Sequence, residues 1–440
     1  MSIRVVGAGL AGCEAAWQIA RAGIEVELYE MKPVRYSPAH HSPDFAELIC
    51  SNSLKAERVE SAAGLLKEEM RRLHSLLMQC ADGCRVPAGG ALAVDRDRFS
   101  QAVTRKISAH PLIHIHREEI TQIPRDGIAV IATGPLTADA LAGKIAALCG
   151  GSLSFFDAAA PIVSAESLNR DRIFAASRYD KGGDDAYLNC PMDKEEYERF
   201  CAALVSAERA PVRDFDVADP KVYEGCMPVE VMAQRGTDTL RFGPLKPVGL
   251  RDPRTGHRPW AVVQLRREDS QGTLYNLVGF QTNLKFGEQK RVFGMIPGLE
   301  NAEYFRYGVM HRNTFLNSPK VLSADYSLRE RPALFFAGQI TGVEGYMESA
   351  SSGIMAGINA VRRLNGRDTL VLPDTTMIGA LSRYVACGSE ADFQPMGANF
   401  GVIPPLEAHI RDKKERYAAF SARSLQELKK IMAANQPGLV

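Results

Sequence analysis

The sequence predicts an α/β fold in which a Rossmann-like dinucleotide-binding domain carries an inserted α+β domain. Three observations support this prediction: a complete βαβ unit with a glycine-rich turn at the start of the chain, a second glycine-rich strand, loop and helix late in the chain, and a change of composition between them. The chain has 440 residues, of which 45% are hydrophobic, so it can build two or three domains with a sizeable core.

The βαβ unit occupies the first thirty residues. Its strand, glycine-rich turn, helix and second strand lie at residues 3–6, Gly7-Ala8-Gly9-Leu10-Ala11-Gly12, 13–22 and 25–29. Gly7 permits a tight turn, Gly9 lets a pyrophosphate approach the backbone, and Gly12 lets the helix pack close to the strand. We therefore expect residues 7–12 to bind a dinucleotide, with the N-terminus of the helix facing its phosphates.

Glu30 ends the second strand, roughly 20 residues after the glycine-rich turn. A carboxylate at this place accepts hydrogen bonds from the adenosine ribose of a dinucleotide. Nothing within the unit separates FAD from NAD. A glycine-rich turn in an ordinary α/β protein is the alternative interpretation.

Overall charge and cysteine use limit the class of protein. The formal net charge is +1, so a nucleic-acid surface would need a local excess of bases. The nine cysteines are scattered, and Cys80 and Cys84 are the only close pair, which is not a zinc pattern. The apolar runs are too short to span a bilayer, and the N-terminus is a strand rather than a signal peptide. We expect a cytoplasmic protein with reduced thiols, no metal site and no membrane contact.

The first domain continues to about residue 150. Small polar residues follow Cys50, in Cys50-Ser51-Asn52-Ser53, and favour a loop beside the cofactor. The last strand of this part ends at Thr133-Gly134-Pro135, which in flavoproteins of the glutathione-reductase type closes the first part of the FAD domain. We therefore expect Gly134 beside the cofactor, with a plain turn as the alternative. Apolar spacing predicts two helices and then two strands, over 60–79, 95–107, 112–116 and 128–132.

Charges are segregated in the middle of the chain. Acids exceed bases by 14 to 8 over residues 171–230, and bases exceed acids by 12 to 6 over residues 241–312. We interpret residues 151–319 as an inserted domain that contacts substrate or RNA. A solvated surface balanced by its acidic neighbour explains the charges equally well. The basic side chains that suit a phosphate backbone are Arg241, Lys246, Arg251, Arg254, Arg258, Lys285, Lys290 and Arg291.

A second glycine-rich segment returns the chain to the first domain, which we extend over residues 320–440. A strand over 334–337 runs into the glycine-rich loop 338–346 and a helix over 347–363. The N-terminus of such a helix suits the pyrimidine end of a flavin, where negative charge accumulates on reduction. This second segment therefore favours FAD over NAD.

Four residues of this segment are expected beside the cofactor: Gly338, Gln339, Gly345 and Gly353. Gly353 also shares a smooth helix face with small residues three and four positions away, and such a face can lie close to a neighbouring element. A basic helical stretch over residues 411–430 is either a solvated face or an RNA contact.

Five motifs occur together in this chain: Gly7-Ala8-Gly9-Leu10-Ala11-Gly12, Cys50-Ser51-Asn52-Ser53, Val86-Pro87-Ala88-Gly89-Gly90-Ala91-Leu92, Cys226-Met227-Pro228-Val229-Glu230 and Tyr307-Gly308-Val309-Met310-His311-Arg312-Asn313-Thr314. With them the chain resembles the folate- and FAD-dependent tRNA (uracil-5-)-methyltransferases of bacteria over nearly its whole length. Residues 338–359 also resemble the larger bacterial enzyme that installs carboxymethylaminomethyl groups on wobble uridine.

The resemblance implies a reaction and its participants. Carbon 5 of uracil is a weak nucleophile, so a thiolate first adds to carbon 6. Carbon 5 then attacks a one-carbon unit that comes from 5,10-methylenetetrahydrofolate through reduced FAD, a base removes the carbon 5 proton, and a hydride completes the methyl group. NAD(P)H reduces the flavin, and the substrate is the T-loop uridine of tRNA, position 54. The resemblance implies Cys226 as the thiolate and Cys50 as the base; the alternative for each is a buried, inert thiol.

Substrate contacts are expected at His311, Arg312 and His40. His311 would stack on the folate pterin or hydrogen-bond the substrate, with His40 as its competitor and a surface histidine as the alternative for both. Other functions stay open: the same chemistry on a ribosomal RNA uridine, an NAD(P)H-dependent flavin oxidoreductase without an RNA substrate, and a non-catalytic flavin-dependent RNA-binding protein. The oxidoreductase predicts a second glycine fingerprint in the middle of the chain, and residues 151–330 contain none.

Overall fold

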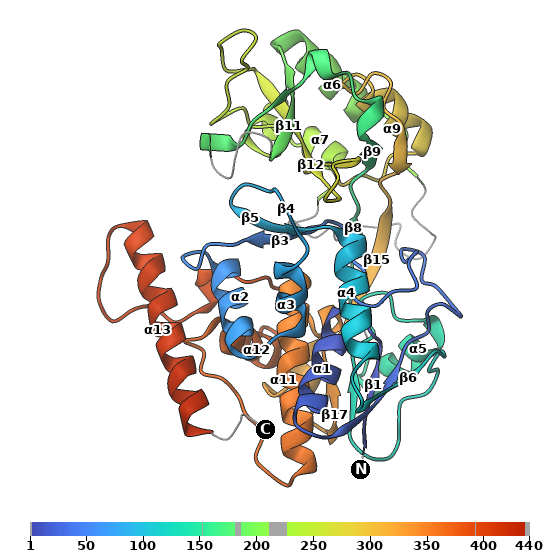
Figure 1. Ribbon diagram of the computed structural model, residues 1–440, viewed down its shortest axis with the longest axis vertical. Coiled ribbons are helices and arrows are strands. Elements are labelled where there is room, and N and C mark those ends of the chain that lie inside the picture. Colours follow the sequence, from blue (N-terminus) through green and yellow to red (C-terminus); the bar gives the residue numbers. More distant parts are fainter. Residues whose placement is uncertain (1, 152, 181–185, 211–226, 392, 436–440) are drawn as a thin grey trace.

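The computed structural model describes residues 2–151, 153–180, 186–210, 227–391 and 393–435. Two six-stranded sheets form the frameworks of a lower and an upper body in Figure 1. A ribbon of two antiparallel strands, β8 (Leu153–Ala158) and β15 (Met310–Phe315), joins them. A small three-stranded sheet lies on the lower body beneath the upper one (Figure 1), with the order β3 (Ser53–Ala56), β5 (Ala91–Val94) and β4 (Arg85–Val86).

The first sheet contains strands from both ends of the chain, in the order β16-β17-β7-β1-β2-β6. All neighbours pair in parallel except β16, which joins β17 antiparallel. Val5 and Val6, which point to opposite faces of the sheet, are both buried, as expected for a parallel sheet covered on both faces. The predicted Rossmann-like α/β fold is therefore confirmed. The strands are β1 (Ser2–Val6), β2 (Glu25–Tyr29), β6 (Ile113–His116), β7 (Ala129–Ile131), β16 (Ser327–Leu328) and β17 (Arg331–Phe336).

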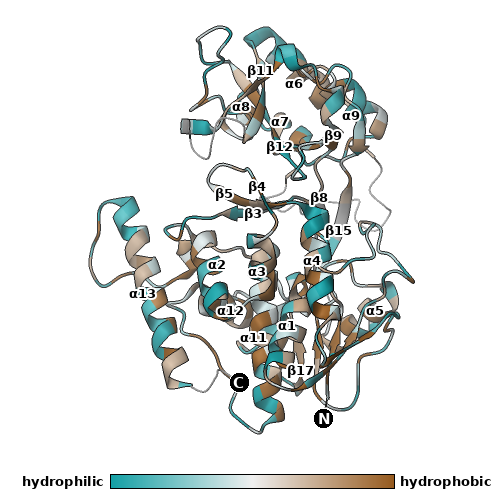
Figure 2. Cartoon of the chain, in the orientation of Figure 1, coloured by the Kyte–Doolittle hydropathy of each residue, from teal (hydrophilic) through white to brown (hydrophobic). Residues whose placement is uncertain are grey.

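The closest helix pair on this sheet is α1 (Leu10–Arg21) with α11 (Tyr346–Leu364). Gly353 and Gly357 of α11 face the backbone of α1, and a Cβ on Gly353 would lie 2.7 Å from Ala11 Cα. Only glycine fits at that separation. The smooth helix face predicted from the sequence is thus present, and it lies in the apolar interior of the lower body, where Figure 2 colours much of α11 and β17 brown.

The single helix predicted over residues 60–79 is wrong, because the chain forms two helices there. His74 adopts a left-handed conformation with φ of 60°, which no α-helix accommodates, and Ser75 then caps the second helix by accepting a hydrogen bond from the Met78 N–H. The helices of the lower body besides α1 and α11 are α2 (Ala62–Arg72), α3 (Leu76–Asp82), α4 (Arg96–Ser108), α5 (Asp139–Leu148), α10 (Ser318–Val321), α12 (Met377–Cys387) and α13 (Lys413–Ala434).

Two fully buried carboxylates fix the helices of the lower body to one another. Glu14 of α1 accepts hydrogen bonds from the N–H groups at the start of α3, and Glu69 of α2 accepts those of Met377 and Ile378 at the start of α12. Burial raises the pKa of each carboxyl to about 7. No helix in the described part of the chain is long and apolar enough to cross a membrane.

The second sheet is antiparallel throughout, in the order β10-β11-β12-β13-β9-β14. Its helices and strands enclose a separate apolar core that includes Phe200, Phe280 and Phe293. The strands are β9 (Ile162–Ser164), β10 (Phe174–Ala175), β11 (Tyr187–Met192), β12 (Ala261–Arg267), β13 (Leu274–Leu277) and β14 (Tyr304–Arg306). The helices are α6 (Lys194–Ser206), α7 (Val229–Gln234), α8 (Thr239–Phe242) and α9 (Phe286–Phe293).

Candidate active site

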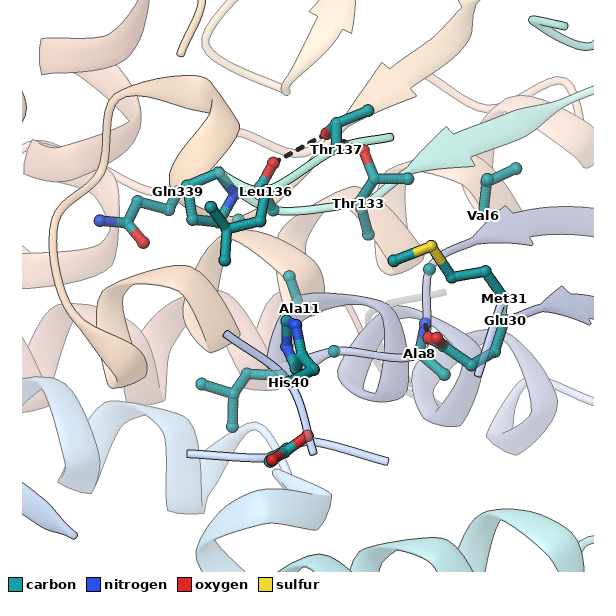
Figure 3. Close-up of a pocket in the computed structure, with 18 of the residues that line it drawn as sticks. Val6, Ala8, Ala11, Glu30, Met31, His40, Thr133, Leu136, Thr137 and Gln339 are labelled. Carbon is teal, nitrogen blue, oxygen red and sulfur yellow. Dashed lines mark hydrogen bonds between the residues drawn. The ribbon is translucent and has the colours of Figure 1, made fainter. Parts of the chain in front are cut away.

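A cavity opens at the carboxyl ends of the parallel strands of the first sheet, where α/β sheets bind their ligands. The loops that follow β1, β2, β7 and β17 all line it, and Figure 3 shows Ala8, Met31, Thr133 and Gln339 from these loops. The loop that carries Cys50 lines it as well. The residues predicted from the sequence that line the cavity are Gly7, Ala8, Gly9, Leu10, Ala11, Glu30, His40, Cys50, Gly134, Gly338 and Gln339.

The glycine-rich turn has the conformation that a bound pyrophosphate needs. Gly7 has a φ of 98°, and a Cβ there would lie 2.6 Å from the Ala132 carbonyl oxygen. Gly12 is pressed against the backbone of Gly7, whereas a Cβ on Gly9 would meet nothing within 4 Å. Gly9 is also the N-cap of α1, and no side chain in the described ranges caps that helix. The first-turn N–H groups and the open face of Gly9 therefore suit a phosphate.

Glu30 is buried at the edge of the cavity and only 7% exposed. Its Oε2 accepts a hydrogen bond from the Ala8 N–H at 2.8 Å (Figure 3). Its Oε1 accepts one from the Lys32 N–H at 3.0 Å. Each carboxylate oxygen has a second lone pair. Glu30 thus holds the glycine-rich turn against β2 and can still accept hydrogen bonds from the ribose of a dinucleotide.

The other loops that line the cavity are held by their own hydrogen bonds. The Thr133 and Thr137 hydroxyl oxygens lie 2.6 Å apart, and the Thr137 hydroxyl donates to the Gly134 carbonyl. Gly338 has a φ of 88° and donates its N–H to the Ser352 hydroxyl at 2.7 Å. These contacts prearrange the loops that surround the cavity.

Several predicted residues lie elsewhere or outside the described side chains. Gly353 packs on α1, and Gly345, with a φ of 121°, lies against Glu348; neither lines the cavity. His311 and Arg312 lie in β15, but the structure does not describe their side chains. Cys226 lies outside the described residues. The roles of these residues stay predictions.

The backbone of the Cys50 loop is held by side chains distant in the sequence. The Tyr346 hydroxyl oxygen accepts hydrogen bonds from the N–H groups of Cys50, at 2.7 Å, and Ser51, at 3.1 Å. Arg96 donates to the carbonyl oxygen of Ile49 at 2.9 Å, and Arg306 donates to the same oxygen at 2.6 Å. Burial raises the pKa of Tyr346 far above its ordinary value, and Cys50 raises it further, so Tyr346 stays a neutral phenol.

The second sheet holds the same loop through β12 and the residues that follow it. Arg266 donates to the Asn52 side-chain oxygen at 2.8 Å and to the Ser51 hydroxyl at 2.7 Å. Glu268 forms a buried ion pair with Arg96, at 2.5 Å. The Cys50 loop is therefore fixed between the two sheets, with three guanidinium groups bonded to it.

The two described ends of the segment that contains Cys226 are both hydrogen-bonded to residues 281–283. The Ala210 N–H donates to the Asn283 carbonyl and the Val229 N–H to the Gln281 carbonyl, both at 2.7 Å. Glu230 accepts hydrogen bonds from the Thr282 hydroxyl and the Asn283 N–H. These anchors precede α9 directly.

Contacts lead from these anchors to the Cys50 loop. Gln289 of α9 exchanges hydrogen bonds with the backbone of Gly308, at 2.7 and 2.8 Å. Two residues before Gly308, Arg306 binds the Ile49 carbonyl. The elements that flank Cys226 are thus tied to the elements that hold Cys50.

Six of the remaining cysteines are in surroundings that make a thiol inert. Burial raises the pKa of each of them, to about 11 for Cys80 and Cys149 and well above its ordinary value for Cys13. A thiol with a raised pKa is a poor nucleophile near neutral pH. The other three are Cys84, Cys190 and Cys201.

Half of the eight basic side chains in the middle of the chain are paired with acids. Lys285 binds Glu208 at 2.5 Å, and Arg291 binds Glu288 at 2.6 Å. Asp238 and Asp252 pair in the same way with two further arginines, Arg241 and Arg254. These four side chains therefore already have an acidic partner at the surface. Within the described residues, no three His, Cys, Asp or Glu side chains gather to hold a metal ion.

Sequence reasoning missed the residues that hold the Cys50 loop. Tyr346 ends the second glycine-rich loop, so its place in the sequence could have identified it as a residue of the site. Arg96, Arg266 and Arg306 stand in ordinary helix and strand patterns, and only the fold brings them to Cys50.

Comparison with known proteins places the chain in a family. The family described as "Glucose inhibited division protein A", GIDA, matches residues 2–368. The methylenetetrahydrofolate--tRNA-(uracil-5-)-methyltransferase TrmFO of Desulfitobacterium hafniense is 64% identical over 434 residues, covering 98% of this chain and 99% of the relative. The protein of the same name from Acetivibrio thermocellus is 60% identical over 432 residues, with 98% of each chain covered.

Solved structures show the same fold. Aquifex aeolicus GidA in its form I crystal matches with a TM-score of 0.71 at 15% identity, covering 100% of this chain and 77% of that one. Its form II crystal matches with a TM-score of 0.70, also at 15% identity, covering 98% and 73%. The chain therefore belongs to the GIDA family and, within it, to the methylenetetrahydrofolate--tRNA-(uracil-5-)-methyltransferases.

Proposed function

We propose that the protein methylates carbon 5 of the T-loop uridine of tRNA, position 54, with the one-carbon unit of 5,10-methylenetetrahydrofolate. The observation that carries the proposal is the 64% identity, over 98% of the chain, with a relative named for this reaction. The cavity supports it, because Cys50 shares its lining with a glycine-rich turn suited to a dinucleotide.

The residues that line the cavity fit FAD. The open face of Gly9 and the uncapped start of α1 would hold the pyrophosphate, and Glu30 would hold the adenosine ribose. The loops at Gly134 and Gly338 would enclose the rest of the cofactor. FAD, reduced by NAD(P)H, supplies the reducing equivalents that turn the one-carbon unit into a methyl group.

The thiols supply the chemistry that activates the pyrimidine. The Cys226 thiolate adds to carbon 6 of the uracil, which makes carbon 5 nucleophilic, and Cys50 removes the proton from carbon 5 after the new bond has formed. The Cys226 thiolate leaves carbon 6 when the methyl group is complete, which restores the double bond of the ring. Tyr346, Arg96 and Arg306 fix the backbone on both sides of Cys50. The two guanidinium groups also stabilise negative charge that develops beside Cys50.

We assign substrate contacts to His40, which lines the cavity, and to His311 and Arg312 of β15. The body built on the second sheet, within residues 151–319, is the part that contacts the RNA. We propose a cytoplasmic location, where tRNA and reduced folates meet.

The proposal is tested by label transfer. The purified protein is incubated with tRNA that lacks 5-methyluridine at position 54, with 5,10-methylenetetrahydrofolate labelled in its one-carbon unit, and with NADPH. We expect label on carbon 5 of uridine 54, none when S-adenosylmethionine is the sole donor, and none on a ribosomal RNA fragment. A yellow, FAD-containing protein that transfers no label to tRNA would refute the proposal.

A further inference from the structure

Three aromatic rings form a continuous stack on the upper body, outside the cavity. The Tyr307 ring lies parallel to Phe286 on one side and to Tyr304 on the other, with centroids 4.6 and 4.7 Å apart and interplanar angles of 16° and 8°. The Tyr304 hydroxyl donates to the Gln289 carbonyl, which fixes the inner end of the stack. Phe286, at the outer end, is 54% exposed.

An exposed phenylalanine at the end of a stack can accept a further ring on its exposed side. Parallel rings at these separations are the geometry in which a further flat ring adds with little rearrangement. Phe286 is the first residue of α9, so a helix and two packed tyrosines hold its plane in place. Its outer side is preorganised for an aromatic partner.

The surroundings of the stack favour an anionic partner. Lys285, Lys290 and Arg291 lie on or directly before α9, and all three are exposed. Lys285 pairs with Glu208 and Arg291 with Glu288, but both pairs lie at the surface, where an ion pair is weak and a phosphate can replace the carboxylate. Aromatic rings among basic side chains are typical of proteins that bind unpaired nucleotides.

The stack is also linked to the loop that carries Cys50. Arg306 lies beside Tyr304 and Tyr307 in the sequence, and it donates to the Ile49 carbonyl next to Cys50. In Figure 1, α9 lies on the upper body above β15, and Gln289 of α9 binds Gly308, just before β15 begins. A nucleotide on Phe286 would therefore be near one whose base reaches Cys50.

We propose that Phe286 is a stacking platform for an unpaired base of the tRNA substrate, next to the uridine that is methylated. The inference rests on the proposed function and extends it. A uridine must leave its own stack before a thiolate can reach carbon 6, and its neighbour then loses a stacking partner. Phe286 replaces that partner. Because Phe286 does not line the cavity, a folate in the cavity is not its ligand.

The test compares four variants of the full-length, FAD-loaded protein. They are Phe286→Ala, Phe286→Leu, Phe286→Trp and Phe305→Ala. Phe305 is the matched control, because it is 71% exposed on the neighbouring strand and makes no ring stack with the described residues. The dissociation constant for unmodified tRNA is measured by fluorescence anisotropy at one salt concentration, and that for tetrahydrofolate is measured without RNA.

We expect Phe286→Ala and Phe286→Leu to raise the dissociation constant for tRNA about tenfold, which is within the range of one base stack. Phe286→Trp retains tight binding, and tRNA quenches its added indole fluorescence. Phe305→Ala behaves as wild type, and all variants keep wild-type affinity for tetrahydrofolate. Unchanged tRNA binding by Phe286→Leu, or a loss confined to tetrahydrofolate, would overturn the inference and leave the proposed function intact. A wild-type protein that neither binds nor methylates tRNA would overturn both.

Discussion

Among single residues, Glu30 holds part of the fold and is also predicted to bind the cofactor. Its position after β2 predicted a contact with the ribose, and the structure adds a second task, because its carboxylate also holds the N–H of Ala8 in the glycine-rich turn. The ribose contact is predicted from spacing along one βαβ unit alone, and it stays a prediction. The second depends on how the turn folds back across the sheet.

Glu30→Ala should therefore weaken FAD binding through both contacts. Each hydrogen bond to a charged group contributes about 1.5–3 kcal/mol, so we expect the dissociation constant for FAD to rise at least tenfold. Glu30→Gln keeps one acceptor oxygen for one of the contacts, so its dissociation constant for FAD should rise less. Equilibrium titration of the apoprotein with FAD measures both variants. Equal FAD affinity for wild type and Glu30→Ala would exclude Glu30 from the site.

Arg96 is a residue that sequence reasoning could not select. It begins α4 and bonds the carbonyl groups of Leu48 and Ile49, and its partner Glu268 comes from the other sheet. Arg96→Ala removes the ion-pair partner of the buried Glu268, which costs up to about 3–5 kcal/mol of folding free energy, less the attraction that Arg266 and Arg306 still supply. It also releases the loop that positions Cys50.

The double variant Arg96→Ala/Glu268→Gln separates these two effects. We expect it to recover part of the thermal stability that Arg96→Ala loses, because Glu268 is no longer a buried charge without its ion-pair partner, while Arg266 and Arg306 lose the attraction of that carboxylate. Its methylation rate should stay at least a hundredfold below wild type, because the Cys50 loop is still unsupported. Single-turnover methylation assays and thermal unfolding measure the two properties. Recovery of the methylation rate together with stability would show that Arg96 only stabilises the fold.

At the scale of elements, the contact between α1 and α11 sets the position of the glycine-rich turn. The pattern of small residues on α11 predicted a close neighbour, and periodicity is sufficient for that prediction. The identity of the neighbour was not predictable, because α1 and α11 are separated by most of the chain. The break between α2 and α3 was missed because the apolar spacing continues through His74, whose left-handed backbone leaves no mark on hydrophobic periodicity.

Gly353→Ala should disturb this contact, because the added methyl group would lie 2.7 Å from Ala11 Cα. We expect a loss of about 1–3 kcal/mol in the free energy of unfolding and weaker FAD binding, since Ala11 belongs to the glycine-rich turn. Gly143→Ala is the matched control. It lies in helix α5, where an added Cβ meets nothing within 4 Å, and should stabilise the protein by about 0.5–1 kcal/mol. Urea unfolding measures both, and equal effects would contradict the packing argument.

At the scale of the whole molecule, the buried carboxylates make stability depend on pH. Burial raises the pKa of Glu14 from 4.5 to about 7, so the folded protein binds a proton that the unfolded chain releases between these pH values. The stabilising contribution of this proton is present at low pH and is lost as pH rises towards 7. The shift corresponds to about 3 kcal/mol.

The comparison with Glu14→Gln isolates this effect. The difference in free energy of unfolding, wild type minus variant, should fall by up to about 3 kcal/mol between pH 5 and pH 8. Chemical unfolding at both pH values measures it. Parallel pH profiles of the two proteins would contradict the assignment.

The arrangement of the whole molecule was predictable in outline. Two glycine-rich segments far apart in the sequence indicated one discontinuous cofactor domain, and strands from both ends of the chain do share one sheet. The boundaries 1–150, 151–319 and 320–440 stay predictions. The sequence could not show that the Cys50 loop is held by both bodies, because its partners, Arg266 of β12 and Arg306 of β14, become its neighbours only when the second sheet has folded.

The central claim is that two thiols act on one uracil. A covalent trap tests this claim most directly. tRNA with 5-fluorouridine at position 54 retains the adduct of a thiolate at carbon 6, because fluorine at carbon 5 cannot leave as a proton does. After incubation with methylenetetrahydrofolate and NADPH, intact-mass spectrometry should show protein–RNA adducts for wild type and Cys50→Ala and none for Cys226→Ala. An adduct that persists in Cys226→Ala would contradict the account.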